Sequence, residues 1–128
     1  MLFRSYAHHP DELAATIAAV RMMGYRRLVL AFQPHTYTRT KALFEEFILE
    51  LSKADVLLVA EIYAARERNT IGISSKELTD RIAGSIYCET LQDVARQLSA
   101  IVQPGDIVLT VGAGDIFRAG EMLLEQKN

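Results

Sequence analysis

Short apolar runs alternate along this chain with segments in which apolar residues recur every three or four positions. The near-continuous apolar runs 28–32, 56–60 and 107–111 predict strands that are covered on both faces. A shorter strand is expected at 85–88, and another directly before Tyr6. The helical spacing predicts helices over the ranges 10–23, 40–53, 75–83, 91–102 and 115–126.

Strands and helices therefore alternate along the whole chain. This order predicts a Rossmann-like α/β fold of three layers, in which a mostly parallel sheet carries helices on both faces. Pro10 suits the first turn of the first helix, and Gly24 suits its end. The 128 residues, half of them apolar, are enough for one domain with a buried core. We expect a single domain over 1–128, without repeats or linkers.

Composition narrows the classes of partner. The net charge is −2, from 14 basic and 16 acidic residues, so neither nucleic acid nor a membrane surface is an expected partner. No apolar run approaches the roughly 20 residues that cross a bilayer. Cys88 is the only cysteine and cannot form an internal disulfide, which suits a reducing compartment. We expect a cytoplasmic location.

Two nucleotide-binding motifs are missing. No Gly-x-x-x-x-Gly-Lys-Ser/Thr sequence occurs, so the chain lacks the loop and lysine that hold ATP phosphates in P-loop enzymes. The segment 112–115, Gly-Ala-Gly-Asp, follows a strand but does not continue with the third glycine of a dinucleotide fingerprint. We therefore expect no ATP hydrolysis by this chain alone and no bound NAD or FAD.

Two dense polar clusters mark a candidate ligand site. The segments 6–11 (Tyr-Ala-His-His-Pro-Asp) and 32–40 (Phe-Gln-Pro-His-Thr-Tyr-Thr-Arg-Thr) each lie where a strand passes into a helix. Open α/β sheets bind their ligands at this edge. Arg39 lies near the positive end of a helix dipole, an unfavourable place for a cation unless an anion compensates. A surface arginine remains the alternative.

The histidines do not predict a metal site. His8 and His9 are adjacent on an extended segment, so their side chains point to opposite faces, and no cysteine or helical histidine pair completes a set with His35. A structural hydrogen-bonding role for one of them stays open. The segment 112–115 has two interpretations: a turn with Asp115 as N-cap, or backbone amides that bind an anion. Residues 66–69 are expected to form a solvated loop.

Five motifs together carry a family resemblance. The two polar clusters are followed by Ser-Lys-Ala-Asp at 52–55, Glu-Ile-Tyr-Ala-Ala-Arg-Glu at 61–67 and Gly-Ala-Gly-Asp-Ile at 112–116. In this order, over essentially the whole chain, they resemble the C-terminal domain of the Mur ligases. The resemblance is strongest to members that join L-alanine to UDP-N-acetylmuramate with ATP and Mg²⁺ during peptidoglycan synthesis. It implies an N-terminal UDP-binding domain and a central P-loop domain outside this chain.

The resemblance also assigns roles to residues. It implies that Tyr6 and His8 line the amino-acid pocket and that Arg39 pairs with the carboxylate of alanine. His35, Gly112 and Asp115 would lie near the same crevice. The domain would close over substrates held by the other domains, and alone it would be inactive.

Two positions depart from the family pattern. Ser5 stands where the family usually has an acid that resembles a nucleotide-ribose ligand, so an ATP contact at Ser5 is doubtful. Thr36 stands where some members carry arginine, which leaves Arg39 as the main cation of its loop. Two alternatives stay open: a stand-alone module that binds an amino acid or another small anion, and the C-terminal domain of the ligase that recycles a murein tripeptide.

Overall fold

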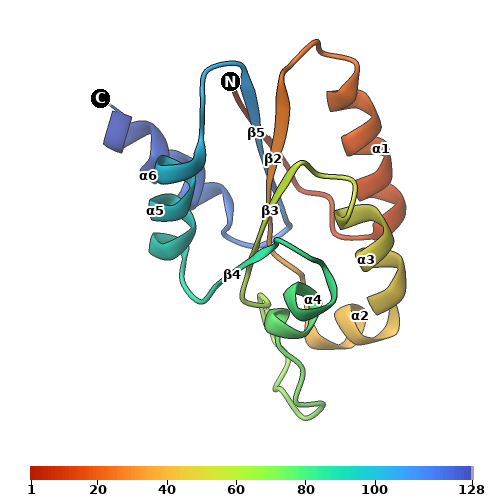
Figure 1. Ribbon diagram of the computed structural model, residues 1–128. Coiled ribbons are helices and arrows are strands. Elements are labelled where there is room, and N and C mark those ends of the chain that lie inside the picture. The colour runs from red at the N-terminus through yellow and green to blue at the C-terminus, as the bar shows by residue number, and fades with distance from the viewer. Residues whose placement is uncertain (128) are drawn as a thin grey trace.

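A five-stranded sheet lies between two layers of helices in the computed structural model, which describes residues 1–127 (Figure 1). The strands are β1 (Leu2–Ser5), β2 (Arg27–Phe32), β3 (Val56–Ala60), β4 (Ile86–Cys88) and β5 (Asp106–Val111). The helices are α1 (Pro10–Arg21), α2 (Tyr37–Ala42), α3 (Phe44–Leu51), α4 (Ser75–Arg81), α5 (Leu91–Ile101) and α6 (Phe117–Lys127). Neighbouring strands are all parallel, in the order β1-β5-β2-β3-β4. The predicted Rossmann-like fold is confirmed.

The central strand shows why the apolar runs are continuous. Leu30 on β2 pairs with Leu109 on β5 and with Leu57 on β3, and all three belong to the core beneath α1, α3 and α4. The next residue, Ala31, faces the opposite core, beneath α5 and α6. Because successive side chains of a strand point to opposite faces, a sheet covered on both sides needs apolar residues at every position.

Two predicted helix boundaries are wrong. The range 40–53 is two helices, because α2 already begins at Tyr37 and the backbone breaks at Leu43, where φ is −114° and ψ is 24°. The last helix begins at Phe117 instead of residue 115. The other helices lie where the spacing predicts them, and His9, Ser74 and Thr90 begin three of them with reciprocal side-chain caps.

The topology concentrates loops at the carboxyl ends of β1, β5 and β2. The helices that follow β1 and β2 pack on one face of the sheet, whereas α6, which follows β5, packs on the other (Figure 1). β5 lies between β1 and β2, so the chain diverges to opposite faces on both sides of it. Ligands of open α/β sheets bind at such points. Within residues 1–127, no helix is long and apolar enough to cross a membrane.

Candidate functional site

Side chains from three loops meet at the carboxyl edge of the sheet. The ring of His8, after β1, lies 6.0 Å from the ring of His35, after β2, measured between centroids. Tyr63, after β3, stacks on His35 with centroids 5.6 Å apart and an interplanar angle of 15°. Arg39, in the first turn of α2, contacts the same imidazole. We refer to His8, His35, Arg39 and Tyr63 as the His35 cluster.

The guanidinium of Arg39 is held by a neutral partner. Its Nη1 lies 3.2 Å from Nδ1 of His35 and donates to the His35 carbonyl oxygen at 3.4 Å. Burial lowers the pKa of His35, and the nearby charges of Arg39 and His8 lower it further. In the neutral imidazole, Nδ1 accepts from Arg39 when the proton is on Nε2. Within the described residues, no carboxylate forms an ion pair with Arg39, so its charge can serve a carboxylate that binds from outside.

The turn before α2 has a backbone conformation that threonine rarely adopts. Thr36 has φ of 69° and ψ of 146°, and such strain costs on the order of 1 to 3 kcal/mol. Contacts on both sides hold it. Its N–H donates to the Tyr63 carbonyl at 2.8 Å, and its hydroxyl accepts from the Arg39 N–H at 3.3 Å. The Tyr63 N–H in turn donates to the Pro34 carbonyl at 2.8 Å, so the loops after β2 and β3 are joined through their backbones.

Glu67 reaches back to the start of α2. Its carboxylate accepts from the N–H groups of Tyr37 at 2.6 Å and Thr38 at 3.1 Å, and from the Thr38 hydroxyl. These hydrogen bonds, led by that of the hydroxyl, lower the pKa of Glu67. The expectation of a loop at 66–69 is confirmed, but Glu67 itself is half-buried and engaged.

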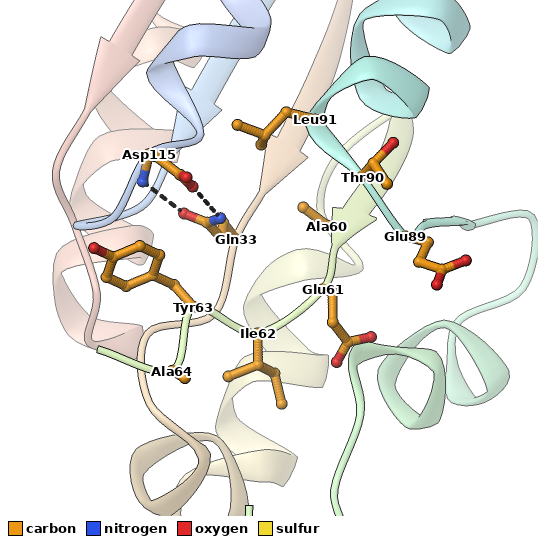
Figure 2. Close-up of a pocket in the computed structure, with 10 residues that line it drawn as sticks. All are labelled: Gln33, Ala60, Glu61, Ile62, Tyr63, Ala64, Glu89, Thr90, Leu91 and Asp115. Carbon is orange, nitrogen blue, oxygen red and sulfur yellow. Dashed lines mark hydrogen bonds between the residues drawn. The ribbon is translucent and has the colours of Figure 1, made fainter. Parts of the chain in front are cut away.

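Gln33 organises the loop after β5 (Figure 2). Its Oε1 accepts from the backbone N–H groups of Asp115 at 3.1 Å and Ile116 at 3.2 Å, while its Nε2 donates to Oδ1 of Asp115 at 2.8 Å. The N-cap interpretation of this loop is wrong, and the anion interpretation does not extend to the amides of residues 115 and 116. Asp115 is not the N-cap, because α6 begins two residues later and its carboxylate bonds to Gln33. The amides of residues 115 and 116 are not open to an anion, because Gln33 occupies them.

A cavity of about 290 Å³ adjoins Gln33 and Asp115, between the ends of β2, β3 and β4. Figure 2 shows Tyr63 near Asp115 on one side of it and Glu89 on the other. Glu61 also lines this cavity, but its carboxylate accepts from the Tyr87 hydroxyl at 2.5 Å, the Ser74 hydroxyl at 2.8 Å and the Ser75 N–H at 3.2 Å. Burial and the Glu61 carboxylate raise the pKa of Tyr87 to about 12. Glu61 thus has a structural role.

The remaining candidates lie closer to β1. Tyr6 is 58% exposed, and its carbonyl oxygen lies 3.2 Å from Nδ1 of His8. The Ser5 hydroxyl accepts from the Ala7 N–H at 3.2 Å and lies 3.4 Å from the hydroxyl of Thr16. Ser5 lines an apolar groove between β1 and α1. Among the described residues, no group of three or more histidine, cysteine or acidic side chains is placed to hold a metal ion.

The structure therefore brings His8, His35 and Arg39 together, and links them to Gly112 and Asp115 through two residues that the sequence analysis did not single out. Tyr63 packs between His35 and the loop after β5, since a Cβ added at Gly114 would lie 2.5 Å from Cγ of Tyr63. Gln33 binds Asp115. Both residues belong to motifs quoted above, and a polar Gln33 directly after a buried strand is a signal that could have found it.

Comparison with known proteins identifies the family to which the chain belongs. Residues 1–114 match the family described as "Mur ligase, glutamate ligase domain". The chain belongs to the family of Mur ligase C-terminal domains. This Mur ligase domain is 45% identical over 124 residues to the UDP-N-acetylmuramate--L-alanine ligase of Lachnospira eligens, covering 94% of the chain and 27% of that protein. It is also 45% identical over 131 residues to the ligase of the same name from Geotalea uraniireducens, covering 98% and 29%. The domain spans less than a third of these relatives.

Solved structures share the fold of this Mur ligase domain. A murein peptide ligase from Psychrobacter arcticus superposes with a TM-score of 0.76 at 20% identity, covering 97% of this chain and 26% of that one. MurF ligase from Thermotoga maritima, in complex with ADP, superposes with a TM-score of 0.69 at 19% identity, covering 99% and 30%. At these identities the likeness concerns the fold alone.

Proposed function

We propose that this domain is the amino-acid-binding, closing part of an ATP-dependent ligase that joins L-alanine to UDP-N-acetylmuramate in peptidoglycan synthesis. The observation that carries the proposal is the guanidinium of Arg39, which His35 holds at the carboxyl edge of the sheet without a carboxylate partner among residues 1–127. A planar guanidinium can bind a carboxylate through two parallel hydrogen bonds. The names of the relatives at about 45% identity indicate which amino acid and which sugar nucleotide to propose.

In this proposal, Arg39 binds the carboxylate of alanine, and Tyr6 and His8 line the pocket around it. His35 suits its place because it stays neutral: burial and Arg39 lower its pKa, so it adds no second full charge beside the guanidinium. Gly112 and Asp115 lie next to the same pocket, in the loop that Gln33 and Tyr63 contact. The pocket thereby fixes one end of the amino acid and leaves its amine directed toward the other domains.

The chemistry explains why a separate closing domain is useful. The muramate carboxylate takes the terminal phosphoryl group of ATP, which forms an acyl phosphate and releases ADP. The amine of alanine then attacks the acyl carbon, and phosphate and a proton leave as the amide forms. Water competes with the amine for such an electrophile, so the site must be closed and dry during the reaction. A domain that carries the amino acid can orient the amine as it closes.

ATP and Mg²⁺ would be held mainly by parts of the ligase outside this chain. Two observations support this division: the P-loop sequence is missing, and Gln33 occupies the amides of residues 115 and 116, so they are not offered to a phosphate. The partners proposed are therefore UDP-N-acetylmuramate, L-alanine and the N-terminal and central domains of the same ligase. A cytoplasmic location is proposed with them, supported by the lone, buried Cys88.

Three assays test the proposal. The purified chain, given UDP-N-acetylmuramate, L-alanine and ATP, is expected to release no phosphate above background, and turnover by the chain alone would contradict the division between domains. In the complete ligase, Arg39→Ala is expected to weaken the use of alanine, because the alanine carboxylate loses its partner. A stand-alone binding module would instead bind alanine tightly as the isolated chain, which isothermal titration calorimetry measures.

A further inference from the structure

The start of α2 receives its negative charge from a distant loop. The first turn of this six-residue helix contains no acidic residue and does contain Arg39. Glu67 supplies the missing acceptors from the segment after β3, 29 positions beyond Thr38. Its two carboxylate oxygens accept from two backbone N–H groups and one hydroxyl at the start of α2. A carboxylate at this end of a helix stabilises it through hydrogen bonds and through the helix dipole.

α2 depends on such contacts because little within the helix stabilises it. An isolated helix of this length is unstable in water, since helix nucleation costs more free energy than one turn returns. The turn before it is strained at Thr36, and the backbone breaks at Leu43 directly after it. The position of the Arg39 side chain therefore depends on the contacts that fix the first turn of α2.

We propose that Glu67 is a positioning residue of the amino-acid site: it fixes the start of α2, and through it directs the guanidinium of Arg39 toward the incoming carboxylate. This inference rests on the proposed function of Arg39. Glu67 does not bind the amino acid itself in this proposal, because the three donors of α2 already engage both of its oxygens. The segment 61–67 thereby becomes part of the site through the residues it holds.

The first test uses the chain itself and does not depend on catalysis. Glu67→Ala is expected to speed hydrogen exchange of the Tyr37 and Thr38 amides by about tenfold or more, since a hydrogen bond to a charged acceptor is lost at each. Glu67→Gln retains an oxygen acceptor without the charge and should give an intermediate rate. Glu125→Ala, which removes an exposed acid on α6, is the matched control and should leave both amides protected. Unchanged protection in both Glu67 variants would overturn the proposal.

The second test separates positioning from general stability in the complete ligase. Glu67→Ala is expected to raise the KM for alanine about tenfold with little change in kcat or in the KM for ATP, and Glu67→Gln should restore part of the loss. In an Arg39→Ala background, Glu67→Ala should add almost nothing, because it acts through Arg39. Additive effects of the two substitutions, or an unchanged KM for alanine where Arg39→Ala raises it, would overturn the inference.

The results distinguish a failure of the proposed function from a failure of the role of Glu67. If Arg39→Ala itself left the KM for alanine unchanged, the proposed function would be wrong, and the inference that rests on it would fall too. Amide exchange would still report whether Glu67 holds α2. If Arg39→Ala raised that KM and Glu67→Ala did not, only the positioning role of Glu67 would be contradicted.

Discussion

Gln33 and Asp115 lie 82 positions apart and bind each other through both polar atoms of the Gln33 side chain. The amide oxygen of Gln33 accepts from the backbone of residues 115 and 116, and its nitrogen donates to the Asp115 carboxylate. This pairing joins the ends of the adjacent strands β2 and β5, at the point where the chain diverges to opposite faces of the sheet. The site is thus built on a fixed connection between two loops.

Replacing Gln33 by alanine should destabilise the domain. Gln33 is 5% exposed and Ile116 is buried, so the substitution leaves backbone N–H groups without an acceptor and with poor access to water. We expect the free energy of unfolding to fall by about 1 to 3 kcal/mol, measured by urea denaturation. Gln92→Ala, at an exposed position on α5, should change it by less than about 0.5 kcal/mol. Equal losses in the two variants would contradict the role of Gln33.

Gly114 should not tolerate a side chain. A Cβ there would lie 2.5 Å from Cγ of Tyr63 and 2.7 Å from Oε1 of Gln33. Gly114→Ala should therefore displace Tyr63 from His35 and lower the free energy of unfolding by about 1 to 3 kcal/mol. Thermal unfolding measures the loss, and the NMR signals of the His35 ring report the displaced stack.

Two variants serve as controls for Gly114→Ala. Adding Tyr63→Ala should recover part of the lost stability, because it removes the ring that the new methyl group meets. Gly120→Ala, on α6, should be tolerated, since the nearest atom is the end of the flexible Leu2 side chain at 3.2 Å. If Gly114→Ala were as stable as Gly120→Ala, the close approach of Tyr63 to this loop would be wrong.

The ion pair between Arg27 and Asp106 predicts a pH dependence of stability. Nε and Nη2 of Arg27 donate to the two oxygens of Asp106 at 3.0 and 2.7 Å, and this guanidinium holds the pKa of the carboxyl below its usual value. Asp106→Asn should lower the free energy of unfolding near neutral pH by about 1.5 to 3 kcal/mol, as for a hydrogen bond to a charged group. Urea denaturation over a range of pH measures it.

The sign follows from the lowered pKa of the folded state. The contribution of Asp106 is fully present above the pKa of an unfolded aspartate, about 3.9, and is lost as the pH falls through the lower pKa of the folded carboxyl. The difference between wild type and Asp106→Asn should therefore shrink below about pH 4. Asp80→Asn, at an exposed position on α4, should lack the large neutral-pH loss. A difference that persists at low pH would contradict an ionic origin.

The strands could be predicted because their environment is uniform. β3 spans the predicted run 56–60, and β2 and β5 each begin one residue before their predicted runs. Both faces of these strands are covered, so burial alone decides their residues. The helix predicted at 40–53 failed for the opposite reason. The start of α2 depends on Glu67 and on the Tyr63 carbonyl, which contact it from a later loop and leave no mark in the local spacing.

The candidate site was predicted in part for a similar reason. His8, His35 and Arg39 lie in dense polar motifs next to predicted strand ends, and the topology brings such ends together. Tyr63 and Gln33 act through partners on other strands, so their roles appear only once the strand order β5-β2-β3 is known. The residue types tyrosine and glutamine alone are equally typical of loop residues without such a role.

Ser5 offers a test of nucleotide contact in the complete ligase. The family resemblance implies an acid at this position, and the prediction rests on the premise that such an acid accepts hydrogen bonds from ribose hydroxyls. Ser5→Asp should lower the KM for ATP, by an amount that corresponds to up to about 1.5 to 3 kcal/mol of binding free energy, the range for a charge-assisted hydrogen bond. The KM for alanine should stay nearly unchanged. Steady-state kinetics with ATP varied provide the measurement, and Ser5→Asn controls for shape without charge. An unchanged KM for ATP would place Ser5 outside the nucleotide site.

Arg39 carries the proposed recognition of alanine, and its replacement is the decisive test. In the complete ligase, Arg39→Ala leaves the alanine carboxylate without its partner and should weaken productive binding by about 2 to 5 kcal/mol. Arg39→Lys should restore only part of this, because lysine supplies the charge without the planar fork. The measurement is steady-state kinetics with alanine varied at saturating ATP and UDP-N-acetylmuramate.

Folding and the state of His35 complete the test of Arg39. The side chain packs little of the core, so Arg39→Ala should change the free energy of unfolding by about 0.5 kcal/mol or less in thermal melts. The pKa of His35 should rise in the variant, because the charge of Arg39 contributes to lowering it, and NMR titration of the imidazole measures this. Arg66→Ala, at an exposed position in the loop after β3, should alter neither alanine kinetics nor folding. Normal alanine kinetics in Arg39→Ala would remove Arg39 from the site, and a failure to fold would assign it a structural role instead.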